Sequence, residues 1–240
     1  MKRSDERTSG DTLPLLVVTG AGRGVGFETA RALARDHASE VIAVSRDVSA
    51  WSVSDRAAGV VPLSADLSTD TGIMAVAHAV GDRPLFGLVN NAGILLKRDL
   101  GSWTAVELDE LYAVNARTPL LLTQVLLPAL LKSPSAHVVN ISSMGGFQGS
   151  VKFPGLIGYS ASKAALACMT ECLAEELSQT NVRCNCLCLG AVDTTMLRDA
   201  FPGYRAPTDA PTMGRFIAEF VSGGHKLLNG KILPVSQSTP

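Results

Sequence analysis

The sequence lacks both a hydrophobic run long enough to span a membrane and an excess of charge of either sign. Its richest apolar stretch, residues 120–131, contains Thr123, Gln124 and Pro128 and falls short of the roughly 20 residues that a spanning helix needs. Lys and Arg total 21 against 22 Asp and Glu, so the formal net charge is −1. We therefore expect no membrane association and no overall electrostatic attraction to nucleic acid.

The sequence also lacks the patterns of a signal peptide and of a disulfide framework. Residues 1–12 are polar and mixed in charge, and the short apolar run after them passes directly into a glycine-rich segment, unlike a secretory leader. Five cysteines are an odd number in a chain of 240 residues, which is too long for a small disulfide scaffold. We expect a cytoplasmic location, with residues 1–12 as a flexible tail.

No linker, internal repeat or low-complexity block divides residues 13–240, so we expect a single domain there. Hydrophobic residues make up 46% of the sequence, which is enough for a sizeable core and excludes a wholly disordered chain. Short apolar runs alternate with helix-like stretches. The expected strands are 15–18, 41–44, 60–63, 85–89, 137–141, 182–189 and 231–235, and the expected helices are 25–35, 71–80, 104–114, 119–131, 160–178 and 212–221.

This alternation predicts an α/β fold. Strands separated by helices favour right-handed crossovers and therefore a doubly wound parallel sheet of the Rossmann type, with helices on both faces. Strands that are apolar almost throughout, such as His137–Ile141, fit a sheet that is covered on both sides.

A glycine-rich turn follows the first expected strand and leads into the first helix. It reads Thr19-Gly20-Ala21-Gly22-Arg23-Gly24-Val25-Gly26. Glycines at such a position let a pyrophosphate approach the backbone at a helix N-terminus. The spacing is T-G-x-x-x-G-x-G rather than the usual G-x-G-x-x-G fingerprint, and an ordinary glycine-rich turn is the alternative.

Further motifs follow in order. Asn90-Asn91-Ala92-Gly93 comes after the fourth strand, Asp66-Leu67 after the third, and Tyr159-Ser160-Ala161-Ser162-Lys163 opens a helix. From about residue 15 to residue 235 the chain resembles the short-chain dehydrogenase/reductase family. The resemblance implies a catalytic tetrad of Asn115, Ser143, Tyr159 and Lys163. It also implies cofactor contacts from Gly20, Arg23, Gly24, Val25, Gly26, Ser45, Arg46, Asp66, Leu67, Asn91, Ala92, Gly93, Tyr159, Lys163, Gly190, Val192 and Thr194.

Tyr159 and Lys163 are four residues apart, so on a helix they share a face. A tyrosine with a pKa of about 10 is a poor acid or base near neutrality, and a neighbouring ammonium lowers that pKa. A shift of about three units needs about 4 kcal/mol, which Lys163 and an oxidised nicotinamide ring could supply together. Without the other motifs, such a pair is more often a simple surface contact.

Ser143 has no adjacent histidine, so it is a poor candidate for a hydrolase nucleophile and a better donor to a substrate carbonyl. Its neighbour Ser142 is a local alternative, and the family pattern favours Ser143. Tyr159 follows Ser143 by 16 residues, longer than is usual in the family, which indicates a short insertion near the substrate. Asn115 lies inside a helical stretch, where an asparagine often only faces water; the resemblance implies a locally disturbed helix and a proton relay to the lysine.

The cofactor preference depends on the end of the second strand, which reads Ser45-Arg46-Asp47. NAD enzymes place an acid in this region, whereas the Arg46 guanidinium can hold a 2′-phosphate. Arg23 is a second cation that NADP-preferring members of the family often carry. Asp47 could neutralise Arg46, and both arginines could simply be solvated. We favour NADPH over NAD.

After the sixth strand the family's usual Pro-Gly is replaced by Leu189-Gly190, which we expect to loosen the loop. The segment from 195 to 212 is short and rich in proline, which suggests an open substrate cleft. Cys184, Cys186 and Cys188 alternate along a strand and share one face, which favours core packing over a metal site. We predict no metal.

The leading hypothesis is an NADPH-dependent carbonyl reductase that can run in reverse as an alcohol dehydrogenase on a small-molecule substrate. An NAD-linked alcohol dehydrogenase and a non-catalytic dinucleotide-binding regulatory protein are the alternatives. The helices at 104–131 and 160–178 carry more apolar residues than one buried stripe needs. In the resembling family these helices pair across a two-fold axis, so we expect a homodimer or homotetramer, with Cys168 and Cys172 near the interface.

Overall fold

The computed structural model describes residues 13–237 of the 240-residue chain. The tail that we expect at residues 1–12 lies outside the described residues. Seven strands form one parallel sheet in the order β3-β2-β1-β4-β5-β6-β9. They are β1 (Leu15–Thr19), β2 (Glu40–Ser45), β3 (Val60–Ser64), β4 (Leu85–Asn90), β5 (Ala136–Ser143), β6 (Val182–Leu189) and β9 (Ile232–Val235). The predicted doubly wound parallel sheet is confirmed, and each expected strand is present.

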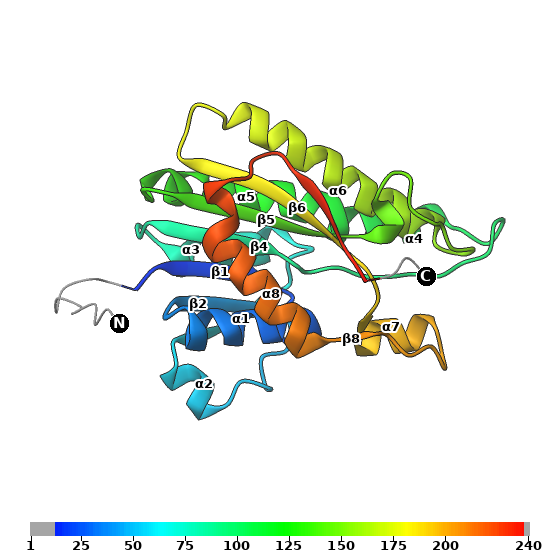
Figure 1. The fold of residues 1–240 in the computed structure, drawn as a ribbon, viewed down its shortest axis with the longest axis horizontal. Coiled ribbons are helices and arrows are strands. Elements are labelled where there is room, and N and C mark those ends of the chain that lie inside the picture. The colour runs from blue at the N-terminus through cyan, green and yellow to red at the C-terminus, as the bar shows by residue number, and fades with distance from the viewer. Residues whose placement is uncertain (1–12, 238–240) are drawn as a thin grey trace.

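Helices cover both faces of the sheet (Figure 1). On one face lie α1 (Gly24–Asp36) and α8 (Ala210–Gly223), which contact each other and share an apolar cluster that includes Leu33 and Ile217. On the other lie α3 (Asp70–Val80), α4 (Ala105–Tyr112), α5 (Thr118–Lys132) and α6 (Ile157–Glu176), and the apolar cluster under α3, α5 and α6 includes Ile73, Leu122 and Ala174. Burial on both faces explains why the central strands are apolar throughout.

The strand order creates a topological switch point between β1 and β4. From β1 the chain winds outward through β2 and β3, and it then returns to place β4 on the other side of β1. The loops that leave β1 and β4 therefore separate at the carboxyl edge of the sheet. In open α/β sheets this crevice is the usual ligand site.

The two helices that we expect at 104–114 and 119–131 form one continuous helix in the structure. A π-turn, Ala113–Arg117, joins α4 to α5, and the Thr118 hydroxyl donates to the Ala113 carbonyl at 2.9 Å. The resulting helix, Ala105–Lys132, has 28 residues and is the one described helix that is long and apolar enough to cross a membrane. Half of its most apolar window is buried inside the protein, and the core helix of a globular domain has the same character.

Four short elements are absent from the sequence prediction. They are α2 (Val53–Ala57), α7 (Thr195–Ala200) and the strand pair β7 (Val192–Asp193) and β8 (Thr208–Asp209). Both helices begin at side-chain caps: Ser52 accepts from the Asp55 amide at 3.2 Å, and Thr194 accepts from the Leu197 amide at 3.3 Å. Elements this short show no measurable hydrophobic period, so local capping is the only signal for them.

Candidate active site

A cavity of about 570 Å³ opens at the carboxyl ends of the strands. Its lining includes every residue that we predict for the site except Asn115. The glycine turn after β1, Ser45 and Arg46 after β2, Asp66 after β3 and Ser143 at the end of β5 all reach it. Residues spread over most of the chain therefore meet in one place, at the crevice that the strand order creates.

The loops after β1 and β4 are in close contact at this crevice. Gly20 has a φ of +65°, and a Cβ there would lie 2.8 Å from the Ala92 Cα. The Asn91 side-chain amide donates to the Thr19 carbonyl at 2.9 Å and to the Gly20 carbonyl at 3.3 Å. Only glycine combines this left-handed conformation with so close an approach. The contact holds the two loops together along one side of the cavity.

Thr19 is a residue of this site that the sequence prediction does not include. Its buried hydroxyl accepts hydrogen bonds from the Asn91 and Ala92 amides, both at 3.0 Å, and donates to the Val89 carbonyl at 3.2 Å. One side chain thus satisfies three backbone groups of the β4 loop. The threonine stands at the start of the glycine motif, and this position was the signal that could have identified it.

The N-terminus of α1 faces the cavity without a side-chain cap. Arg23 is the N-cap residue and makes no capping hydrogen bond, and the first turn contains no acidic residue. The first amides of a helix have no partner within the helix, and together with the helix dipole they attract an anion. Gly24 and Gly26 line the cavity at this point and leave the backbone accessible.

Arg23 and Arg46 are exposed and both line the cavity. Asp47 forms no ion pair with Arg46 in the described part of the chain, and its carboxylate accepts from the Ser49 amide at 2.9 Å. The positive charge of Arg46 acts instead on the Asp66 carboxyl. Hydrogen bonds from Ser68, with a smaller contribution from the Arg46 charge, lower the pKa of the Asp66 carboxyl. Arg46 therefore remains available to an anion.

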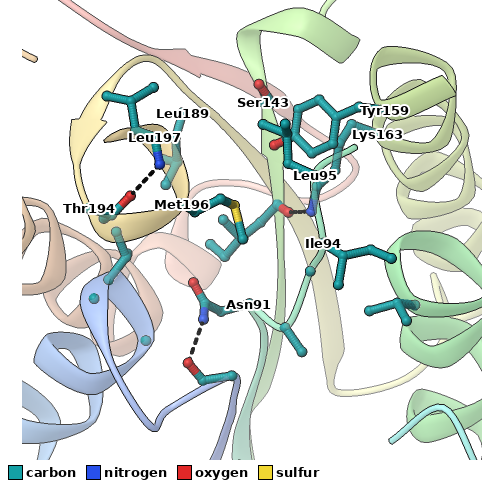
Figure 2. Close-up of a pocket in the computed structure, with 18 of the residues that line it drawn as sticks. Asn91, Ile94, Leu95, Ser143, Tyr159, Lys163, Leu189, Thr194, Met196 and Leu197 are labelled. Carbon is teal, nitrogen blue, oxygen red and sulfur yellow. Dashed lines mark hydrogen bonds between the residues drawn. The ribbon is translucent and has the colours of Figure 1, made fainter. Parts of the chain in front are cut away.

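Ser142 and Ser143 have separate roles at the end of β5. The buried Ser142 hydroxyl donates to the Lys163 carbonyl at 2.8 Å and so holds β5 against α6. The Ser143 hydroxyl lies in the cavity beside Tyr159 (Figure 2) and accepts from the Gly145 amide at 3.1 Å. This arrangement favours Ser143 over Ser142 as the group that meets a substrate.

Asn115 lies behind the cavity wall, in the π-turn between α4 and α5. Its side chain accepts from the Ile94 amide and donates to the Ile94 carbonyl, both at 2.9 Å, and it also donates to the Ser162 hydroxyl at 3.0 Å. The Ser162 hydroxyl in turn donates to the Tyr159 carbonyl at 2.8 Å. Ser162 is therefore a second residue that the prediction missed, although it lies within the Tyr159–Lys163 motif. A π-turn often marks a functional position in a helix.

Strand β6 includes Leu189, the residue that we expect to loosen the loop after it. Leu189 is the last residue of β6 and pairs with Ser143 on one side and Val235 on the other. The loop begins only at Gly190, whose amide donates to the Val235 carbonyl at 2.9 Å. Leu189 is therefore held in the sheet between β5 and β9. Val192 and Thr194 line the cavity as predicted.

The cysteines lie partly in the core and partly on the surface. Cys184, Cys186 and Cys188 are fully buried on β6, so the prediction of core packing is confirmed. Cys168 and Cys172 are exposed on α6.

Comparison with known proteins identifies the family. Residues 14–205 match the short chain dehydrogenase family. The chain belongs to the short-chain dehydrogenase/reductase family. It is 33% identical over 187 residues to the "ketoacyl reductase HetN" of a Nostoc species, covering 75% of this chain and 64% of that protein, slightly less than two thirds of its length. It is 31% identical over 207 residues to a carbonyl reductase of Sus scrofa that is named for NADPH, covering 85% and 79% of the two chains.

Solved structures of this family support the same assignment. The 3-ketoacyl-(acyl-carrier-protein) reductase from Brucella melitensis, complexed with NADH, has a TM-score of 0.78 and 25% identity over 92% of this chain and 96% of that chain. A putative NAD(P)-dependent gluconate 5-dehydrogenase from Beutenbergia cavernae, with bound NADP, has a TM-score of 0.82 and 28% identity over 93% and 95%. The family membership supports an oxidoreductase that binds a nicotinamide dinucleotide.

Burial shifts the pKa values of Tyr159 and Lys163 in this short-chain dehydrogenase/reductase. Burial raises the pKa of Tyr159 above its usual 10.0, and a hydrogen bond with Ser143 only partly opposes that rise. The expected lowering requires Lys163 together with an oxidised nicotinamide ring, so it stays a prediction for the cofactor complex. The Lys163 ammonium instead donates to the Ile141 carbonyl at 2.8 Å (Figure 2).

Burial also lowers the pKa of Lys163 from its usual 10.5 to about 8. Near neutral pH the folded protein therefore holds a buried, protonated amine that would be more stable in water. Between about pH 8 and pH 10.5 the unfolded chain keeps a proton that the folded chain has released. Stability should thus increase with pH across this window.

We predict that Lys163→Met abolishes this increase. At pH 7 the variant should be more stable than the wild type by up to about 3 kcal/mol, because the buried charge is removed, and the difference should shrink as the pH approaches 10.5. Urea unfolding at a series of pH values measures it. Lys231→Met, which changes an exposed lysine, is the control and should show no such trend. A variant that is less stable than the wild type at every pH contradicts the prediction.

Proposed function

We propose that the protein is an NADPH-dependent carbonyl reductase that can run in reverse as an alcohol dehydrogenase, with Tyr159 as the proton donor. The observation that carries the proposal is the single cavity that has Ser143, Tyr159 and Lys163 together with the glycine turn, Arg23 and Arg46 in its lining. The similarity to a carbonyl reductase named for NADPH supports the reaction class. Five unpaired cysteines in the described residues support a reducing compartment such as the cytoplasm.

The residues present fit a dinucleotide. The uncapped first turn of α1 suits a diphosphate, and Gly24 and Gly26 of this turn line the cavity. Asp66 and Leu67 line the cavity beside the end of β3, where the family contacts the adenosine. Val192 and Thr194 line it beyond β6 and would hold the carboxamide end. A nicotinamide bound in this way supplies the hydride.

The protein's own groups can then stabilise the negative charge that develops on the substrate oxygen. The Ser143 hydroxyl can donate a hydrogen bond to a carbonyl, which stabilises the growing alkoxide. The Tyr159 hydroxyl lies beside it and can deliver the proton as general acid. Lys163 is four residues further along α6 and carries the positive charge that stabilises the resulting phenolate. Asn115 supports this arrangement through Ser162 and the Tyr159 carbonyl.

The preference for NADPH depends on Arg46. The Arg46 guanidinium lines the cavity and forms no ion pair with Asp47 in the described residues. Its positive charge helps to lower the pKa of the Asp66 carboxyl. A planar guanidinium is well suited to a 2′-phosphate, and Arg23 supplies a second positive charge at the same cavity. An NAD-linked alcohol dehydrogenase and a non-catalytic dinucleotide-binding protein remain the alternative outcomes of the experiments below.

We predict that Tyr159→Phe abolishes turnover while NADPH binding is retained. The change removes the phenolic proton donor and keeps the ring, so the loss should appear in kcat. The assay follows the absorbance of the reduced cofactor with a panel of carbonyl compounds, and fluorescence titration measures cofactor affinity. Tyr112→Phe makes the same change on the exposed surface of α4 and should leave both unchanged. Near-normal kcat in Tyr159→Phe would show that another group is the acid.

We predict that Arg46→Asp shifts the preference from NADPH toward NADH. A charged hydrogen bond to the 2′-phosphate is worth about 1.5–3 kcal/mol, or about ten- to a hundredfold in affinity. Titration of both reduced cofactors into both proteins measures the ratio. Arg56→Asp changes another exposed arginine outside the cavity and controls for net charge. A wild-type protein that already uses NADH better than NADPH would refute this assignment.

We also propose that the chain forms a homodimer through α4, α5 and α6. Large apolar side chains are exposed along these helices, among them Val106, Leu120, Leu131 and Ile157. Cys168 and Cys172 are exposed on α6 as well. Exposed apolar helix faces of this extent usually contact a partner.

We predict a solution mass of at least twice the 25.1 kDa of one chain, measured by light scattering at micromolar concentration. Leu131→Glu should lower the dimer fraction, because it places a charge on the exposed face of α5. Leu227→Glu changes another exposed leucine that lies outside these helices, and it should leave the dimer intact. A monomeric mass for the wild type rules the dimer out.

A further inference from the structure

We propose that the substrate is a compact apolar carbonyl compound, such as a bicyclic aromatic ketone, rather than a sugar or another polyhydroxylated molecule. This inference rests on the proposed function and specifies its substrate class. It comes from a set of cavity-lining side chains that we call the apolar wall: Leu95, Phe153, Leu156, Met196, Phe201 and Tyr204.

The apolar wall stands beside the proposed catalytic groups. Leu156 lies one turn before Tyr159, and its carbonyl accepts from the Ser160 amide at 2.8 Å. Figure 2 shows Leu95 close to Ser143 and Tyr159, and Met196 projecting into the cavity from the side of Thr194. A carbonyl group that meets Ser143 and Tyr159 therefore places the rest of its molecule against these side chains.

Three separate segments supply the wall. Leu95 comes from the loop after β4. Phe153 and Leu156 come from the lengthened loop between Ser143 and Tyr159, and Met196, Phe201 and Tyr204 come from the segment around α7. The sequence insertion and the proline-rich segment therefore both contribute side chains to the apolar wall.

The lengthened loop is docked in a defined position. The Arg98 amide donates to the Gly155 carbonyl at 2.9 Å. Gly155 has a φ of +82°, and a Cβ there would lie 2.9 Å from the Lys97 side chain. This contact between two loops brings Phe153 to Phe201, and their ring centroids are 6.1 Å apart in an edge-to-face arrangement, a geometry that aromatic pairs favour.

Lys97 holds the wall from the other side. Its ammonium lies 4.6 Å from the centroid of the Phe201 ring, within the range of a cation–π contact. Within residues 13–237, Lys97 forms no ion pair with a carboxylate. Phe153 and Lys97 thus both contact Phe201, in the segment that follows α7. Our expectation of an open substrate cleft stays a prediction.

The chemistry of the wall selects against hydroxyl groups. None of its six side chains is charged, and the Tyr204 hydroxyl is its one strong hydrogen-bonding group; the Glu110 carboxylate of α4 lines the cavity outside the wall. A sugar hydroxyl that is buried here without a partner loses about tenfold or more in affinity. Each methylene that is buried instead gains about fourfold. An apolar ring body fits the wall, and a chain of hydroxyls does not.

The first test measures binding without turnover. Wild-type protein saturated with NADP⁺ is titrated by calorimetry with α-tetralone, a bicyclic aromatic ketone, and with xylulose, a ketose of similar size. We expect α-tetralone to bind at least tenfold more tightly. If xylulose binds equally well or better, or if α-tetralone does not bind, the inference is wrong.

A parallel assay separates this inference from the proposed function. The same two compounds are offered with NADPH and with NADH, and oxidation of the cofactor is followed. Binding of α-tetralone with no reduction of either compound would overturn the reductase assignment and leave the apolar site standing. Reduction of xylulose in preference to α-tetralone would keep the reductase and overturn the apolar substrate class.

Two variants test the wall itself. Phe153→Ser and Phe201→Ser should each weaken α-tetralone binding about tenfold or more, with unchanged affinity for NADP⁺ and a melting temperature that confirms folding. Phe216→Ser is the matched control, because Phe216 is a partly exposed aromatic residue of α8 outside the cavity. Unchanged α-tetralone affinity in both wall variants would show that the wall does not select the substrate.

Discussion

The close approach of the loops after β1 and β4 is the constraint on which the site depends. Gly20 leaves no room for a side chain against Ala92, and Asn91 closes the contact through the Thr19 carbonyl. A parallel sheet with this strand order must separate the two loops at its carboxyl edge. Thr19 and Asn91 hold the two loops together at their base, which fixes one side of the crevice. The free amides at the start of α1 lie on that side.

The opposite side of the crevice is positioned by contacts between β5 and α6. Ser142 binds the Lys163 carbonyl, and a Cβ on Gly146 would lie 2.6 Å from the backbone of Lys163. These contacts bring the end of β5, with Ser143, to the turn of α6 that carries Tyr159. They also bury the Lys163 amine, which lowers its pKa to about 8. The buried Lys163 charge lowers stability at this point of the cavity, and functional sites commonly show such a conflict with stability.

The two ends of the cavity are formed by different kinds of groups. The end that we propose for the dinucleotide consists of backbone amides, glycines and exposed arginines that suit a charged, extended ligand. The end that we propose for the substrate consists of side chains from three segments whose packing depends on one another, through Phe153, Phe201 and Lys97. The first end uses short stretches of consecutive residues. The second uses residues that are far apart in the sequence, and this difference decides which of them can be predicted.

The sequence alone determined the sheet, its helices and most of the site, because those features follow from local patterns. Apolar runs of strand length, glycines at a strand–helix turn and the four-residue spacing of Tyr159 and Lys163 are all legible without a structure. Only the tertiary structure decided what depends on packing between segments. It joined two expected helices through the π-turn at Asn115, placed the Tyr159 hydroxyl where partial burial raises its pKa, and brought Phe153 against Phe201. Burial and contacts between distant residues are properties of the assembled fold, so no local pattern encodes them.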